Sequence, residues 1–168
     1  MKSRILASFI TALAFISFGL TSPANATQPV TKKATYTLVL LQAQPTIKTW
    51  NVEDSIPGAI ESIFGAKLTN TKGKNAGYLT GSIVTDDILD IGDPGEYRHR
   101  NLTFTLPDGQ ILAKGNSFYP LDQVQLKFDE SAVIAVIGGT GKYLGARGEV
   151  KTIRKTNGTY RHEFTLLK

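Results

Sequence analysis

The chain has 168 residues, a formal net charge of +5 at pH 7 and no cysteine. Without cysteine it is neither a disulfide-stapled secreted domain nor a lipid-anchored bacterial lipoprotein, so its stability must come from packing. Basic residues near the C-terminal end alternate with apolar ones, and no aromatic platform is interleaved with them. This pattern is typical of a solvated strand face and argues against a nucleic-acid partner.

The first 26 residues have the three parts of an export signal. Lys2 and Arg4 form a basic start, residues 5–20 are mostly apolar, and Ala24-Asn25-Ala26 has the small-x-small pattern of a processing site. The alternative is a membrane anchor, but serines and threonines dilute the apolar run. We therefore expect a signal peptide at 1–26 and a secreted or periplasmic protein that has no membrane contact after cleavage.

The rest of the chain predicts a flexible leader at 27–33 and one domain at 34–168, which is long enough for a single core and too short for two. Residues 35–41 are rich in β-forming side chains and predict a strand. Pro45 then breaks the pattern, and residues 46–52 either continue this strand or pair beside it.

Further strands alternate with short turns along the chain. Segments 62–68 and 76–84 flank a polar, glycine-containing stretch that predicts a hairpin loop. The acidic residues, glycines and proline of 86–96 predict a loop. Segments 97–106 and 110–119 then flank Pro107-Asp108-Gly109, whose residue types favour a turn.

The last third contains the most distinctive motif, a glycine-rich run at 137–148 that follows the apolar strand 131–137. It lacks the spacing of a phosphate-binding loop, because Val136 stands where the first glycine is needed and Tyr143 follows the lysine. No helix follows, which also excludes a dinucleotide fingerprint. The glycines therefore predict a tight connection between two strands.

Two final strands, 145–155 and 159–167, flank Asn157-Gly158, which is the strongest short hairpin signal. The chain thus predicts about eight strands, with 56–64 as the only helical candidate. We expect an all-β fold, a small closed eight-stranded antiparallel barrel, because closure removes exposed strand edges. A β-sandwich is the alternative.

Several motifs between Ser62 and Leu167 occur together in one known group of barrels. They are Gly65-Ala66-Lys67-Leu68, Gly77-Tyr78-Leu79-Thr80-Gly81-Ser82, Asp108-Gly109-Gln110-Ile111-Leu112-Ala113-Lys114-Gly115-Asn116 and, most specifically, Gly138-Gly139-Thr140-Gly141-Lys142-Tyr143 followed by Ala146-Arg147-Gly148. In these motifs the chain resembles the allene oxide cyclase-like and dirigent-like barrels, and it looks like an exported bacterial member.

The resemblance implies a barrel of lipocalin-like outline, often a homotrimer, that binds a small apolar molecule and guides its cyclisation or stereoselective coupling by enforcing a conformation, without a cofactor. Known members place an acid on the first strand. Residues 35–44 contain none, so no catalytic residue is carried over. The competing interpretation is a non-catalytic carrier or a structural barrel whose lumen is filled with side chains.

Candidate ligand-binding residues lie on two strands, whose alternate side chains point into a barrel. Tyr160 and His162 share a face with Phe164 and Leu166, which predicts that this face is interior. His162 is the best candidate, as a general base or hydrogen-bond donor with a pKa near working pH. The alternative is a histidine at the rim that contacts solvent or backbone.

The second set of candidates is the polar face formed by Tyr97, His99, Asn101 and Thr103. Two histidines on separate strands, without a third ligand, do not make a zinc site, and the acidic residues of 86–93 lack the spacing of a calcium loop. We therefore expect no metal.

Overall fold

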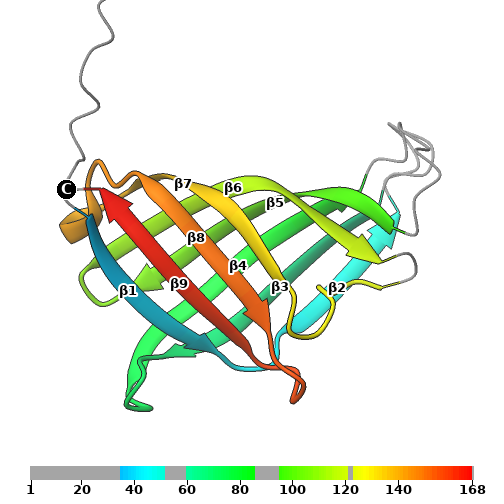
Figure 1. The fold of residues 1–168 in the computed structure, drawn as a ribbon, viewed down its shortest axis with the longest axis horizontal. Helices are drawn as coiled ribbons and strands as arrows, with labels where there is room; N and C mark the ends of the chain where they lie inside the picture. Colours follow the sequence, from blue (N-terminus) through cyan, green and yellow to red (C-terminus); the bar gives the residue numbers. More distant parts are fainter. Residues whose placement is uncertain (1–34, 52–59, 86–94, 121–122, 168) are drawn as a thin grey trace, which may run out of the picture. The chain divides into compact units, whose positions relative to one another are not determined.

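The computed structural model describes residues 35–51, 60–85, 95–120 and 123–167 (Figure 1). The expected signal peptide and leader, and most of the acidic loop at 86–96, lie outside these residues. The described chain forms nine strands and one short 3₁₀ helix: β1 (Thr35–Gln42), β2 (Thr46–Asn51), β3 (Ile60–Thr69), β4 (Asn75–Thr85), β5 (Gly95–Leu106), β6 (Gly109–Pro120), β7 (Ser131–Gly139), η1 (Gly141–Tyr143), β8 (Gly148–Arg154) and β9 (Tyr160–Leu167).

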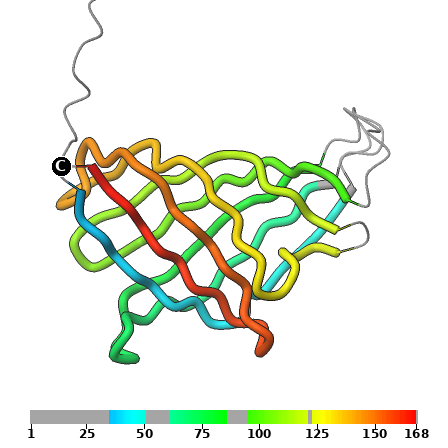
Figure 2. The backbone as a smooth tube through the Cα atoms, viewed as in Figure 1, coloured from blue at the N-terminus to red at the C-terminus, as the bar shows by residue number. Residues whose placement is uncertain are grey.

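The strands form one antiparallel sheet in the order β1-β9-β8-β7-β6-β5-β4-β3-β2, which closes where β1 also pairs with β3. The expected closed eight-stranded barrel is therefore confirmed, with β2 as an additional strand. Figure 2 follows the backbone around it, with β1 beside β9. Among the described residues, no helix is long and apolar enough to cross a membrane.

The extra strand follows from the break at Pro45. Gln42 of β1 pairs with Leu68 of β3, whereas Thr46 of β2 pairs with Gly65, which lies three residues earlier in the same strand. β1 and β2 thus lie one after the other against β3. Proline has no backbone N–H to donate to a ladder, so the chain leaves the sheet there and rejoins it on the other side of the break.

One half of the lumen is an apolar core. Phe104 and Phe164 are buried and meet edge to face, with ring centroids 4.9 Å apart. Leucine, isoleucine and valine side chains of β1 and of β3 to β9 pack around them. Tyr143 of η1 and Ala146 belong to the same cluster and cover this end of the barrel. Apolar side chains therefore fill this half of the lumen.

The glycine-rich run packs its backbone against the turn between β5 and β6. The amide of Lys142 donates to the carbonyl oxygen of Asp108 (2.8 Å), and the Gln110 amide donates to the Thr140 hydroxyl (3.1 Å). Gly141 has a φ of 58°, and an added Cβ would overlap the Asp108 carbonyl oxygen. The expected tight connection is present, and it includes a single 3₁₀ turn.

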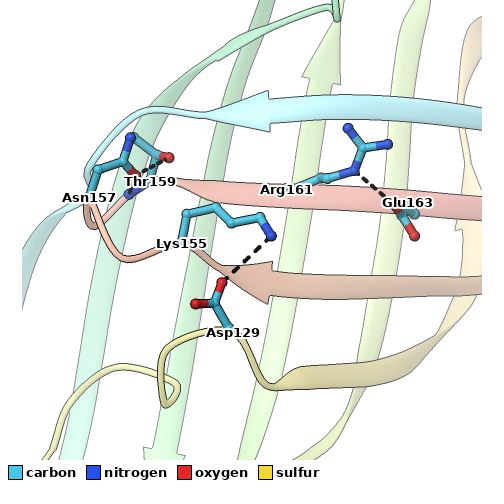
Figure 3. Close-up of polar contacts among 6 residues, drawn as sticks. All are labelled: Asp129, Lys155, Asn157, Thr159, Arg161 and Glu163. Carbon is cyan, nitrogen blue, oxygen red and sulfur yellow. Dashed lines mark hydrogen bonds and ion pairs between the residues drawn. The ribbon is translucent and has the colours of Figure 1, made fainter.

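The hairpin between β8 and β9 has the expected Asn-Gly turn. The Asn157 side-chain oxygen accepts hydrogen bonds from the Thr159 amide (3.1 Å) and hydroxyl (2.7 Å), as Figure 3 shows in part. On the outer surface nearby, Lys155 lies 3.6 Å from Asp129, and Arg161 pairs with Glu163 at 2.7 Å (Figure 3). The turn positions Tyr160 and His162 at the start of β9.

Candidate functional site

The other half of the lumen is polar. Its inward-facing side chains are buried and come from five strands: Gln42 of β1, Arg100 of β5, Ser117 and Tyr119 of β6, Thr152 of β8, and Tyr160 and His162 of β9. We call these seven residues the polar chamber. They lie toward the end of the barrel where β5 and β9 begin and β1 and β6 end.

His162 is the fixed centre of the chamber. Its Nε2–H donates to Oε1 of Gln42 (2.8 Å), and the Thr152 hydroxyl donates to Nδ1 (3.0 Å). The ring is stacked on Tyr160, with centroids 6.5 Å apart. Both ring nitrogens are therefore engaged, which holds the imidazole in one tautomer and one orientation.

His162 is neutral at neutral pH. It is 1% exposed. Burial, and next the nearby Arg100 charge, lower the pKa of His162 to about 3. The predicted interior position is correct, but the predicted pKa near working pH is wrong because desolvation strongly disfavours the charged imidazole. The rim position weighed as the alternative is also wrong. His162 serves here as an oriented hydrogen-bonding group.

Arg100 is the charged group of the chamber. Its side chain is 3% exposed, Nη1 donates to the Ser117 hydroxyl at 3.3 Å, and Nε has no hydrogen-bond partner. Arg98, the next inward position toward the barrel end, is ion-paired with Glu96 and lies over the Tyr119 ring, 4.7 Å from its centroid. Glu96 compensates the charge of Arg98, so Arg100 carries the positive charge of the chamber.

Two tyrosines, Tyr119 and Tyr160, line the chamber in their protonated form. Burial raises the pKa of Tyr160 to about 12, although the charges of Arg154 and Arg100 oppose the shift. Burial also raises the pKa of Tyr119. Both phenols therefore stay protonated at neutral pH, and the Tyr160 hydroxyl donates to Oε1 of Gln125 (2.9 Å).

The segment 123–126 covers the chamber. Besides the bond from Tyr160 to Gln125, Arg98 donates to the Gln123 carbonyl oxygen and Arg154 donates to that of Leu126 (2.9 Å). The cavity beneath has a free volume of about 20 Å³, enough for one water molecule. Its lining combines chamber and apolar residues: Gln42, Pro45, Ile47, Phe64, Ile83, Arg100, Tyr119, Val124, Gln125, Leu126 and Tyr160.

The candidates on β5 lie on the outer face of the barrel. Tyr97, His99 and Asn101 are exposed, and Tyr97 meets Phe118 edge to face at 5.5 Å. The expectation that this face lines the lumen is wrong, because Leu102 and Phe104 bury the opposite one. The structure thus brings Tyr160 and His162 together in the chamber and separates the three β5 residues from them. Their ligand-binding role stays a prediction.

Asn101 does line a groove, on the outside of β2 to β5. This groove has a volume of about 590 Å³ and is open to solvent. Small residues such as Gly65, Thr80 and Ser82 form much of its floor. No group of three or more metal-binding side chains occurs among the residues that the structure describes.

Sequence reasoning missed Arg100, Gln42, Ser117, Tyr119 and Thr152 as site residues. For Arg100 a signal was available, because it shares its face with Leu102, Phe104 and Leu106, and that apolar face must be the interior one. For Gln42 and Thr152 the signal is the strand pairing itself. Gln42 pairs with Tyr160 across β1 and β9, and Thr152 pairs with His162 across β8 and β9.

The protein is thus a small closed antiparallel barrel whose lumen has one apolar and one polar half. No protein-family model and no curated protein matches the sequence. Solved structures share the fold. Pyocyanin demethylase is 23% identical (TM-score 0.57; 79% of this chain and 99% of that chain), and AbnU, an exo-specific intermolecular Diels-Alderase, is 16% identical (0.58; 79% and 98%).

A dirigent protein also has this fold. The pterocarpan synthase dirigent protein is 14% identical, with a TM-score of 0.51 over 80% of this chain and 83% of that chain. Identities this low show a common barrel fold and do not transfer an activity. They agree with the barrel fold that the sequence resemblance implies.

Proposed function

We propose that the protein binds a small, largely apolar molecule in the polar chamber and guides its cyclisation or stereoselective coupling without a cofactor. The observation that carries this proposal is the set of buried polar side chains at one end of an otherwise apolar lumen. Burying polar groups such as Arg100 and His162 costs free energy that apolar side chains would avoid. Local violations of this kind mark functional sites.

The protonation states of the chamber favour conformational control over acid–base catalysis. Neutral His162, with a pKa of about 3, and Tyr160, with a pKa of about 12, do not exchange protons readily at pH 7. What the chamber offers is shape, fixed hydrogen-bonding groups and one guanidinium. These groups orient a substrate and stabilise charge that develops during ring closure or coupling. This class of reaction is supported by the fold that the chain shares with a Diels-Alderase and a dirigent protein.

Ligand binding requires movement of the covering segment, since the cavity holds only one water molecule. Three hydrogen bonds from Arg98, Tyr160 and Arg154 hold residues 123–126 in place. Val124 is 42% exposed and makes the boundary between the cavity and solvent. Displacing this short segment would open the chamber beside apolar Ile47, Ile83 and Phe64, which suit the body of an apolar molecule.

The test is a reaction assay with a matched pair of tyrosine variants. The protein is incubated with a panel of linear polyenes and unsaturated epoxides, and chiral chromatography follows the products. We expect non-racemic product from the wild type and from Tyr78→Phe, whose side chain is exposed on the outer face of β4. Tyr160→Phe loses one hydrogen bond in the chamber and should change the rate about tenfold. Racemic product at the uncatalysed rate across the panel would contradict the proposal.

A second candidate function is a non-catalytic barrel, which the small free volume of the lumen favours. A carrier would yield a bound metabolite on extraction and release it unchanged. A purely structural barrel would yield none, and its melting temperature would not respond to any molecule of the panel. Native mass analysis of the purified protein, followed by organic extraction, separates these two cases from each other.

We also propose that the protein is exported and processed, from the basic, apolar and small-residue segments of 1–26. Expression of the full chain in a bacterial host should give an extracytoplasmic product whose mass corresponds to a start at Thr27. Replacing Ala24 and Ala26 with bulky residues should block this processing, because signal peptidases need small side chains there. An unprocessed chain retained in the cytoplasm would contradict the proposal.

A further inference from the structure

Arg100 is the most deeply buried of the interior arginines, 3% exposed against 7% for Arg98, and it lacks a counter-charge. Arg98 is ion-paired with Glu96. Arg154, whose Nε is also unsatisfied, is only partly buried, donates to a carbonyl oxygen and lies 4.0 Å from the Phe128 ring centroid. Arg100 has one long hydrogen bond, to the neutral hydroxyl of Ser117, and its Nε is unsatisfied. Within the described part of the chain it makes no ion pair.

A buried guanidinium without a partner is unfavourable, because the lost hydration is not replaced. Glu96, the closest acidic residue along β5 on the same face, is already engaged by Arg98. No inward-facing position that the structure describes on β1, β3, β4 or β6 to β9 carries an acid. The compensating negative charge is therefore missing from the described protein.

The position of Arg100 indicates where this charge belongs. Arg100 lines the covered cavity together with the phenol-bearing side chains of Tyr119 and Tyr160. Its positive field extends over the chamber, since it opposes ionisation of His162 and favours that of both tyrosines. Apart from the amides of Gln42 and Gln125, the remaining walls are apolar and include Ile47, Phe64 and Leu126. The cavity thus offers a cationic, hydrogen-bonding floor and apolar sides.

We propose that the ligand of this barrel carries an anionic oxygen, a carboxylate or a phenolate or enolate, which binds the Arg100 guanidinium while the apolar body of the ligand lies against Ile47, Phe64 and Leu126. The inference rests on the proposed function, because it names the chemical class of ligand for the same chamber. The anionic oxygen occupies the cavity that has room for one water molecule, and the rest of the ligand displaces the covering segment 123–126. Arginine suits this role because its planar fork pairs with two acceptor atoms.

The experiment compares matched ligands that differ in charge. Cinnamate and cinnamamide, and benzoate and benzamide, are titrated into the protein by calorimetry at pH 7. We expect each carboxylate to bind at least tenfold more tightly than its amide. Arg100→Gln should abolish this preference and leave amide binding unchanged. Arg161→Gln removes an outward-facing arginine on β9, paired with Glu163 (Figure 3), and should keep the preference.

The outcomes separate this inference from the proposed function. Equal binding of acid and amide to the wild type, or an unchanged preference in Arg100→Gln, overturns the anionic ligand and leaves the chamber as a binding site. No binding of any probe contradicts both. If Arg100→Gln does not fold, Arg100→Lys provides the test, because it keeps the charge but loses the fork. It should weaken carboxylate binding several-fold while the preference for the carboxylate persists.

Discussion

Lowering the pH from 7 to 4 is expected to reduce the free energy of unfolding by about 3 kcal/mol through His162 alone. The ordinary histidine pKa of 6.5 applies in the unfolded chain, whereas the folded pKa is about 3. Between these values the unfolded state binds a proton that the folded state does not, so stability falls as the pH falls. Above pH 6.5 the contribution is constant, and below about pH 3 the loss is complete.

The matched control is His162→Gln, whose amide can still donate to Gln42 and accept from Thr152. Urea unfolding of both proteins at pH 7, 5.5 and 4 gives the difference that belongs to His162, because the carboxylates titrate in both. Glu163 is one such group, with a pKa lowered by its hydrogen bond to Arg161. We expect the wild type to lose stability more steeply than the variant. Parallel pH profiles would mean that the imidazole is not desolvated in the folded state.

The strand pattern of the barrel could be predicted from the sequence because most strands expose one face and bury the other. In β9, alternation of Tyr160, His162, Phe164 and Leu166 with polar residues correctly indicates the interior. The Asn157-Gly158 turn then fixes where the hairpin reverses. Local signals of this kind depend on neighbouring residues only, so a single sequence is enough to read them.

The face of β5 was harder to assign, because both of its faces carry polar residues at one end. Tyr97 and His99 resemble ligand-binding groups, whereas Arg98 and Arg100 resemble solvent-exposed charges. The structure buries the arginines. Arg98 can be buried because Glu96, two residues away on the same face, pairs with it. Leu102 and Phe104, which continue the arginine face, were the more reliable guide to the interior.

The chamber itself could not be predicted, since its contacts join strands that are distant in the chain. Gln42 and His162 are separated by 120 positions and meet only because β1 pairs with β9 and closes the barrel. Their hydrogen bond depends on the register of that pairing. A shift of one residue would direct His162 outward. Residue types suggested a histidine in the lumen, but its neutral state depends on partners that only the closed barrel brings together.

The glycine-rich run gives the other large expected effect: Gly148→Ala should destabilise the fold by about 3–5 kcal/mol. Gly148 begins β8 with a φ of 142° and pairs with both Val136 and Leu166. An added Cβ would overlap the carbonyl oxygen of Thr165, and neither sheet partner can move away without losing ladder hydrogen bonds.

Gly145→Ala is the control, because its φ is 75° and no atom lies within 4 Å of the added Cβ. Only the backbone strain of about 1 kcal/mol applies there. Urea unfolding at pH 7 measures both variants. Equal losses would show that the close approach of β8 and β9 at Gly148 is dispensable, and that the run acts only through its backbone freedom.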